Sequence, residues 1–159
     1  GVPGSNTATR YGGANLLYAT ADTDSSFLQL NEMPPAGVTL AGWDARTTTT
    51  SGAAVYGLHQ PLGDLLKYSV GSVSGFLNCS ASGIDVLCTV GNSNSNFYDV
   101  TWSQGVTEGG SSGSGLFKDG RLIGTLFGGS SSCTVRGGTD TYGRFDAIFN
   151  NQLWKWLAS

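Results

Sequence analysis

Residues 107–117 read TEGGSSGSGLF, and they are the part of the chain best suited to nucleophilic chemistry. A serine hydroxyl can attack a carbonyl once a base takes its proton, and glycines let backbone N–H groups approach the negative charge that then develops. The same letters are also typical of a flexible linker. Strand-like residues border the run on both sides, however, and too little chain follows for a second core. We therefore expect an ordered turn that carries a reactive serine.

A serine nucleophile needs a base, and His59 is the only histidine in the sequence. Asp24, His59 and Ser112 follow one another in the Asp, His, Ser order that subtilisin-type enzymes use. Those enzymes need a large parallel α/β core, whereas this chain shows almost no helical pattern. We therefore reject that arrangement and expect His59 to be a strand-end or surface histidine without a catalytic role.

The composition favours a single domain built from strands. Apolar residues make up 39% of the 159 residues and aromatic residues 11%, which is too much for a disordered chain. The 25 glycines suit many short strands joined by tight turns. Charged residues make up 12% of the chain and the net charge is -3. No basic patch therefore invites nucleic acid, and no apolar run is long enough to cross a bilayer.

Short strand-like runs follow one another along most of the sequence, and only the tail NNQLWKWLAS (150–159) has a helical pattern. Residues 1–13 are expected to form an exposed arm or loop. Asp119-Gly120 is a strong hairpin signal between two such runs. This order predicts a closed β barrel or a sandwich. The expected runs are ANLLYATA (14–21), SSFLQLN (25–31), GVTLAGWD (37–44), AAVYGLH (53–59), LLKYSVGSVSGFLN (65–78), IDVLCTV (84–90), NFYDVTW (96–102), GLFKDGRLIGTLFGG (115–129) and YGRFDAIF (142–149).

The low charge and hydroxyl-rich composition suit a secreted protein, and the chain contains three cysteines. Cys79 and Cys88 bracket a natural hairpin loop and are expected to form a local disulfide. Cys133 is left over, which in a secreted protein indicates a missing partner. The alternative is a free, buried thiol. With one histidine and no CxxC pair we expect no zinc site, and no set of ligands points to another metal or cofactor.

The stretch GVTEGGSSGSGLFKDGRLIGTLFGGSSSC (105–133) resembles the C-terminal barrel of chymotrypsin-fold serine endopeptidases, and most of all the bacterial lysyl endopeptidase group. The resemblance runs in order from about Tyr18 to the C-terminus. It implies an all-β fold, a chymotrypsin-like antiparallel β barrel with a C-terminal helix. Residues 1–35 would be the end of an N-terminal barrel, and residues 36–159 the C-terminal barrel. The other matching segments are ADTDSSFLQLNEMPPAGVTLAGWDAR (21–46), VYGLHQPLGDLLKYS (55–69), GGTDTYGRFDAIF (137–149) and LWKWLAS (153–159).

Carried over residue by residue, the resemblance implies the parts of a serine protease site. Ser112 would be the nucleophile, and the N–H groups of Gly110 and Ser112 would form the oxyanion hole. Asp24 would be the carboxylate that orients the catalytic histidine. The alternative for Asp24 is a loop acid before a strand. The histidine at His59 matches a position in the group that is not catalytic.

The resemblance also implies a specificity pocket. Asp140 matches the acid that selects a Lys or Arg side chain, since an unpaired buried charge is costly. The backbone of Phe127, Gly128 and Gly129 would line this pocket and pair with an extended peptide. Phe127 stands where the lysyl group carries a histidine, so the preference between Lys and Arg stays open. The alternative for Asp140 is a turn acid that caps the following strand.

The resemblance places the catalytic histidine in a segment before the aspartate, and the chain contains no such segment. The same segment would hold the cysteine that pairs with Cys133. We therefore expect the C-terminal part of a secreted trypsin-like endopeptidase, nearly inactive by itself, whose partner is an N-terminal protease segment. The alternatives are a non-catalytic β-barrel binding module and an inert proteolytic fragment.

Overall fold

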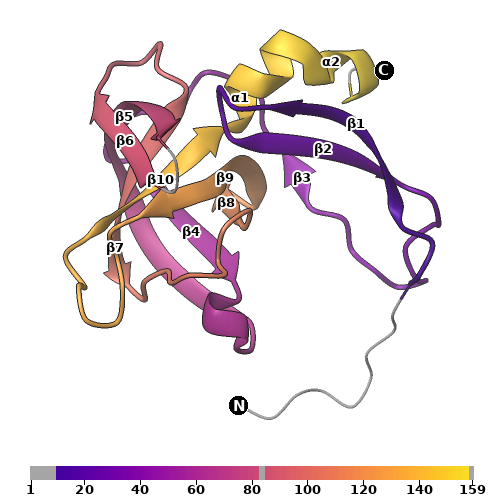
Figure 1. Cartoon of the computed structure of the whole chain (residues 1–159), viewed down its shortest axis with the longest axis horizontal. Helices are drawn as coiled ribbons and strands as arrows, with labels where there is room; N and C mark the ends of the chain where they lie inside the picture. Colours follow the sequence, from indigo (N-terminus) through magenta and orange to yellow (C-terminus); the bar gives the residue numbers. More distant parts are fainter. Residues whose placement is uncertain (1–9, 83–84, 158–159) are drawn as a thin grey trace.

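A computed structural model describes residues 10–82 and 85–157 of the chain (Figure 1). Its centre is a closed, six-stranded antiparallel barrel in which each strand pairs with the next and β10 returns to β9. Closure removes the unpaired sheet edges that an open sheet would expose. The expected barrel is therefore confirmed, and its strands in spatial order are β10 (Thr139–Arg144), β7 (Phe97–Gln104), β5 (Lys67–Ser82), β4 (Ala54–His59), β8 (Gly115–Lys118) and β9 (Arg121–Gly129).

The inside of the barrel is filled by side chains that alternate along its strands. In β4, for example, Val55, Gly57 and His59 are buried while their neighbours are more exposed. This alternation puts one face of each strand in the core. The rest of the core consists of aliphatic and tyrosine side chains: Val73, Tyr98, Val100, Leu116, Ile123, Leu126 and Tyr142.

Two local predictions are confirmed in this barrel. Asp119 and Gly120 form the turn between β8 and β9 with positive φ values of 50° and 75°, as a two-residue hairpin requires. Cys79 and Cys88 stand directly opposite each other in β5 and β6 (Asp85–Val90) and form a disulfide.

The chain before the barrel forms a separate antiparallel pair, β1 (Ala14–Thr20) and β2 (Ser25–Leu30). This hairpin lies beside the terminal helix (Figure 1), and Phe27 packs on Trp156 with ring centroids 5.9 Å apart. Leu28 and Leu30 are exposed, so Phe27 is the apolar residue of β2 that faces inward. Whether residues 1–35 and 36–159 act as separate parts stays a prediction, and residues 1–9 lie outside the described range.

The expected strand over residues 37–44 is mostly wrong. Only β3 (Gly42–Trp43) is a strand, and it pairs in parallel with β9. Val38 and Leu40 are exposed, whereas Trp43 packs against Phe145 and Phe149. Trp43, which is partly buried, is the one apolar side chain of this segment packed against the helical tail, and the rest of the segment before it is exposed.

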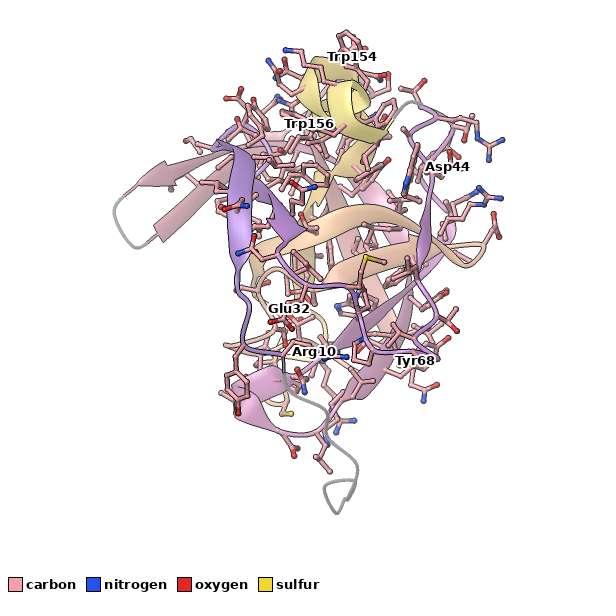
Figure 2. All side chains as sticks on the ribbon, turned by 90° about the vertical axis from the view of Figure 1, so that its right-hand side faces the viewer. Arg10, Glu32, Asp44, Tyr68, Trp154 and Trp156 are labelled. Atoms are coloured by element: carbon pink, nitrogen blue, oxygen red, sulfur yellow. A yellow bond between two sulfur atoms is a disulfide. The ribbon has the colours of Figure 1, made fainter. Side chains whose placement is uncertain are left out.

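The expected strand over residues 142–149 is wrong in its second half. β10 ends at Arg144, and a helical tail follows as α1 (Phe145–Ile148), the π-helical turn η2 (Phe149–Leu153) and α2 (Trp154–Leu157). Phe145, Ile148 and Leu153 bury one face of this tail against the β1–β2 hairpin and Trp43. Trp154 points away from the molecule (Figure 2), and its side chain is exposed. The predicted terminal helix is confirmed, although its last two residues lie outside the described range.

The junction between barrel and tail is held by a buried ion pair. Arg144 donates two hydrogen bonds to the carboxylate of Asp146. Both residues are buried, with exposed fractions of 5% for Arg144 and 2% for Asp146. A second arm of the guanidinium donates to the carbonyls of Ser93 and Ser95.

No helix in the described residues is long and apolar enough to span a membrane.

Loss of Arg144 should destabilise the fold, because it leaves the Asp146 carboxylate and two carbonyls buried without a donor. We expect Arg144→Met to lower the free energy of unfolding by about 3–5 kcal/mol, measured by urea denaturation. Arg46→Met is the matched control, since Arg46 pairs with Asp44 at the same spacing in the sequence but lies at the surface. It should lower the free energy of unfolding by no more than about 1 kcal/mol. Equal effects of the two substitutions would contradict this account.

Candidate active site

The segment 107–114 is an ordered turn between β7 and β8. The Ser111 N–H donates to the Glu108 carbonyl at 3.0 Å, and the Ser114 N–H donates to the Ser111 carbonyl at 3.1 Å. Gly113 and Ser114 are joined to β9, because the Gly113 N–H donates to the Leu126 carbonyl and the Leu126 N–H donates to the Ser114 carbonyl, both at 2.8 Å. The turn therefore extends the barrel, and the linker interpretation is excluded.

Glycine is required at two positions of this turn. Gly110 and Gly113 have φ values of 90° and 80°, a conformation that side chains rarely tolerate. Ser112 lies between them and is exposed, whereas its neighbour Ser111 is 1% exposed. Within the described residues, the N–H groups of Gly110 and Ser112 donate to no backbone or side-chain acceptor. The turn thus presents one accessible hydroxyl and two free backbone donors.

Asp24 lies in the turn between β1 and β2, immediately before β2, and is exposed. Its φ of 45° is unusual for a residue with a side chain. Partial burial raises the pKa of its carboxyl. Asp24 and Ser112 line the same open cavity of about 660 Å³, so two segments far apart in the sequence meet at one surface.

Asp140 is fully buried inside β10, so the alternative of a turn acid is wrong. Its Oδ2 accepts hydrogen bonds from Trp102 Nε1 at 2.6 Å, Thr107 Oγ1 at 2.8 Å and Ser131 Oγ at 2.5 Å. Its Oδ1 accepts only the Ser131 N–H, at 3.3 Å. No Lys, Arg or His side chain in the described residues forms an ion pair with this carboxylate. Oδ2 therefore has all the hydrogen bonds it can accept, whereas Oδ1 can accept a further hydrogen bond.

The end of β9 lies directly against this carboxylate. A Cβ atom on Gly129 would come within 2.1 Å of Asp140 Oδ1, which explains why this position needs glycine. Gly128 and Gly129 pair with β10 on one side, whereas on the other side β8 begins only opposite Thr125 and does not reach them. The ring of Phe127 stacks on buried Phe97 with centroids 5.3 Å apart.

His59 is the residue whose position the sequence predicted least well. It ends β4 as expected, but it is 2% exposed and so is not at the surface. Its Nδ1 lies 2.9 Å from Ser111 Oγ, and its Nε2 lies 2.9 Å from Ser69 Oγ. Both ring nitrogens are therefore occupied beneath the turn, and neither is available to Ser112. The buried position of Ser111 beside an exposed Ser112 was the signal that sequence reasoning lacked.

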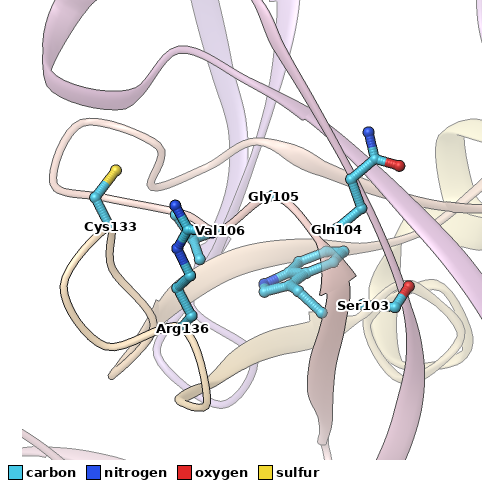
Figure 3. A pocket seen from close by; sticks show the side chains of 7 residues that line it. Ser103, Gln104, Gly105, Val106, Cys133 and Arg136 are labelled. Carbon is cyan, nitrogen blue, oxygen red and sulfur yellow. The ribbon is translucent and has the colours of Figure 1, made fainter.

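Cys133 is a free and exposed thiol, so the alternative of a buried thiol is wrong. The neighbouring Glu108 carboxylate raises the pKa of this thiol. Cys133 and Arg136 lie on one side of a cavity of about 480 Å³ and Gln104 on the other (Figure 3), and Trp102 also lines this cavity. Asp140 does not line this cavity, although Trp102, which does, donates a hydrogen bond to Asp140. In the described residues no cluster of His, Cys, Asp or Glu side chains could hold a metal ion.

Comparison with solved structures supports the fold. A chymotrypsin of Cellulomonas bogoriensis matches with a TM-score of 0.58 and 19% identity, over 87% of this chain and 72% of that chain. The active form of a protease from M. tuberculosis matches with a TM-score of 0.62 and 18% identity, over 92% of this chain and 59% of that chain. At these identities the likeness shows the chymotrypsin-like fold.

Comparison of sequences shows the family. A lysyl endopeptidase of Pseudomonas aeruginosa is 41% identical over 127 residues, which are 77% of this chain and 25% of the relative. The chain therefore spans about a quarter of the length of this relative. The family model for the lysyl endopeptidase C-terminal domain matches residues 2–143. The chain thus belongs to the lysyl endopeptidase C-terminal domain family of chymotrypsin-fold serine proteases.

Proposed function

We propose that the chain is the C-terminal part of a secreted serine endopeptidase that hydrolyses peptide bonds after Lys or Arg. The observation that carries this proposal is the cavity shared by Asp24 and the exposed Ser112, beside two free backbone N–H groups. A nucleophile, an acid to orient its base and donors for the oxyanion are the parts that acyl transfer needs. The disulfide and the family both support secretion.

In the proposed reaction, Ser112 Oγ attacks the peptide carbonyl while a histidine takes its proton. The carbonyl oxygen becomes an oxyanion, which the N–H groups of Gly110 and Ser112 stabilise. The histidine then gives its proton to the leaving amine, and the C–N bond breaks to leave an acyl-enzyme on Ser112. Water hydrolyses this ester by the same steps and restores the serine.

The base is proposed to come from a protein segment outside these 159 residues. The chain has a single histidine, and both nitrogens of His59 are occupied by serine hydroxyls. The matching region is 25% of the Pseudomonas aeruginosa relative, which leaves room for such a segment. Asp24 would accept a hydrogen bond from the imidazole and hold its tautomer. The chain by itself would then be nearly inactive.

Asp140 is proposed to select the basic side chain. A buried carboxylate with hydrogen-bond donors but no cation is a costly arrangement that a Lys or Arg side chain of the substrate would complete. Oδ1 has the free capacity to accept such a donor. The edge of β9 at Phe127, Gly128 and Gly129 would pair with the substrate backbone and bring its side chain toward Asp140.

Replacement of Asp24 by asparagine tests the proposed catalytic arrangement. In the full-length protein, Asp24→Asn should lower kcat for a Lys or Arg peptide by about 10⁴-fold, because the amide favours the wrong tautomer of the catalytic histidine. The control is Asp22→Asn, since Asp22 lies in the same turn but does not line the cavity with Ser112. A normal kcat for Asp24→Asn would contradict the arrangement.

Replacement of Asp140 by asparagine tests specificity. The amide oxygen can still accept the three bonds made to Oδ2, and only the long 3.3 Å bond from the Ser131 N–H to Oδ1 is lost, so the fold should persist without the negative charge. We expect kcat/KM for Lys and Arg peptides to fall at least about 100-fold, and the preference over a matched Leu peptide to disappear. Asp99→Asn is the control on the adjacent strand β7. An unchanged preference for basic residues would show that another group selects them.

A further inference from the structure

His59, Ser111 and Ser69 form a buried polar network directly beneath the nucleophile turn. The three residues are 2%, 1% and 1% exposed. Two further backbone groups complete the network, because the Glu108 N–H donates to Ser111 Oγ at 3.4 Å and Ser69 Oγ donates to the Val106 carbonyl at 3.3 Å. Buried polar groups are costly unless all of them find partners. Any role of this network in catalysis rests on the function proposed for Ser112.

The hydrogen capacity of these groups fixes the direction of every bond. Ser69 uses its single hydroxyl hydrogen on the Val106 carbonyl, so it must accept from His59 Nε2–H. A neutral imidazole with a proton on Nε2 has an acceptor at Nδ1, and Ser111 Oγ–H donates to it. Ser111 in turn accepts from the Glu108 N–H. In this arrangement alone does every donor have an acceptor.

Ser111 connects this network to the reactive turn. It precedes Ser112 and follows Gly110, the two residues whose N–H groups are free in the described part of the chain. A second contact holds the same turn, because the Leu62 N–H donates to the Gly109 carbonyl at 2.7 Å. A change in the backbone conformation of Ser111 would therefore also change the direction of the neighbouring N–H groups of Gly110 and Ser112.

We propose that His59 is a positioning residue that, as the neutral Nε2–H tautomer, holds Ser111 and thereby fixes the Gly110 and Ser112 N–H groups toward the oxyanion. A cationic imidazole would also donate from Nδ1. Ser111 would then have to accept this bond, and its hydroxyl hydrogen would lose its acceptor. The neutral ring and the correct turn therefore require each other.

The charges around His59 are consistent with a neutral ring. Burial lowers the pKa of His59, and the Asp140 carboxylate on β10 opposes this effect in part. Lys67 stands opposite His59 on β5, but its ammonium pairs with Asp64 at 2.8 Å. The Glu108 carboxylate accepts the Cys133 N–H at 2.6 Å. As the pH falls below about 6.5, the histidine of the unfolded chain is therefore protonated before His59 of the folded chain. The folded state should lose stability as the pH falls from about 6.5 to the lower pKa of folded His59.

The first test reads the tautomer directly. Because the 159-residue chain has one histidine, ¹⁵N-histidine labelling of this chain gives a single imidazole in long-range ¹H–¹⁵N spectra. We expect a protonated Nε2 and an unprotonated Nδ1 at neutral pH, with a midpoint of titration below that of free histidine. An Nδ1–H tautomer, or a cationic ring at neutral pH, would overturn the proposal. This test is independent of any enzymatic activity.

The second test compares two matched variants in the full-length protein. Ser111→Ala removes one bond to the His59 ring and one to the Glu108 N–H, whereas the control Ser95→Ala removes a buried hydroxyl outside this network that accepts the Asn92 N–H at 3.0 Å. Ser111→Ala should lower kcat by about 10–100-fold with little change in KM, because misdirected donors weaken transition-state binding. Ser95→Ala should keep kcat within about 2-fold of the wild type, although it too loses a buried hydrogen bond.

Equal values of kcat in Ser111→Ala and the wild type, or equal losses in the two variants, would overturn the positioning role and leave the proposed function intact. A wild-type full-length protein without peptidase activity would overturn the proposed function and this role with it. In that case the imidazole spectrum would still report whether the buried network exists.

Discussion

The pair of hydrogen bonds between Leu126 and the segment Gly113–Ser114 is the constraint on which the site depends. These bonds extend the β8–β9 ladder to the residues just before Gly115, the first residue of β8, and attach a glycine-rich turn to the rigid barrel. Without them the Gly/Ser segment would occupy many conformations, because fixing its backbone in one of them costs conformational entropy. With them, the exposed side chain of Ser112 has a fixed position, and the N–H groups of Gly110 and Ser112 have a fixed orientation. A preorganised site requires that fixed geometry.

Two buried polar groups extend this constraint into the barrel. His59 holds the turn from below through Ser111, and Asp140 binds Thr107 at the start of the same segment. Only 2% of His59 and 0% of Asp140 are exposed, so their hydrogen bonds are protected from competition by water. The barrel thus does more than carry the turn. Its β4 and β10 strands supply the side chains that support the turn at its middle and its beginning.

Much of the fold was predictable because it depends on local rules. Asp119-Gly120 specifies a two-residue hairpin, the spacing of Cys79 and Cys88 suits a cross-strand disulfide, and the glycines of the turn require positive φ. The errors came from tertiary contacts. The run after Arg144 is helical where Phe145 and Ile148 pack against the hairpin and Asp146 pairs with Arg144, and His59 is buried with Ser111 and Ser69 beside its two nitrogens. A periodic pattern in the sequence reveals neither set of contacts.

In the proposed mechanism, Ser112 is a nucleophile activated by a base from outside this chain. Reaction with a serine-directed phosphonate carrying a Lys side chain, followed by peptide mass mapping, tests this most directly. We expect rapid and stoichiometric modification of Ser112 in the full-length protein, and modification slower by at least about 10³-fold in the 159-residue chain alone. Failure to modify Ser112 in the full-length protein, or an equal rate in the isolated chain, would contradict the mechanism.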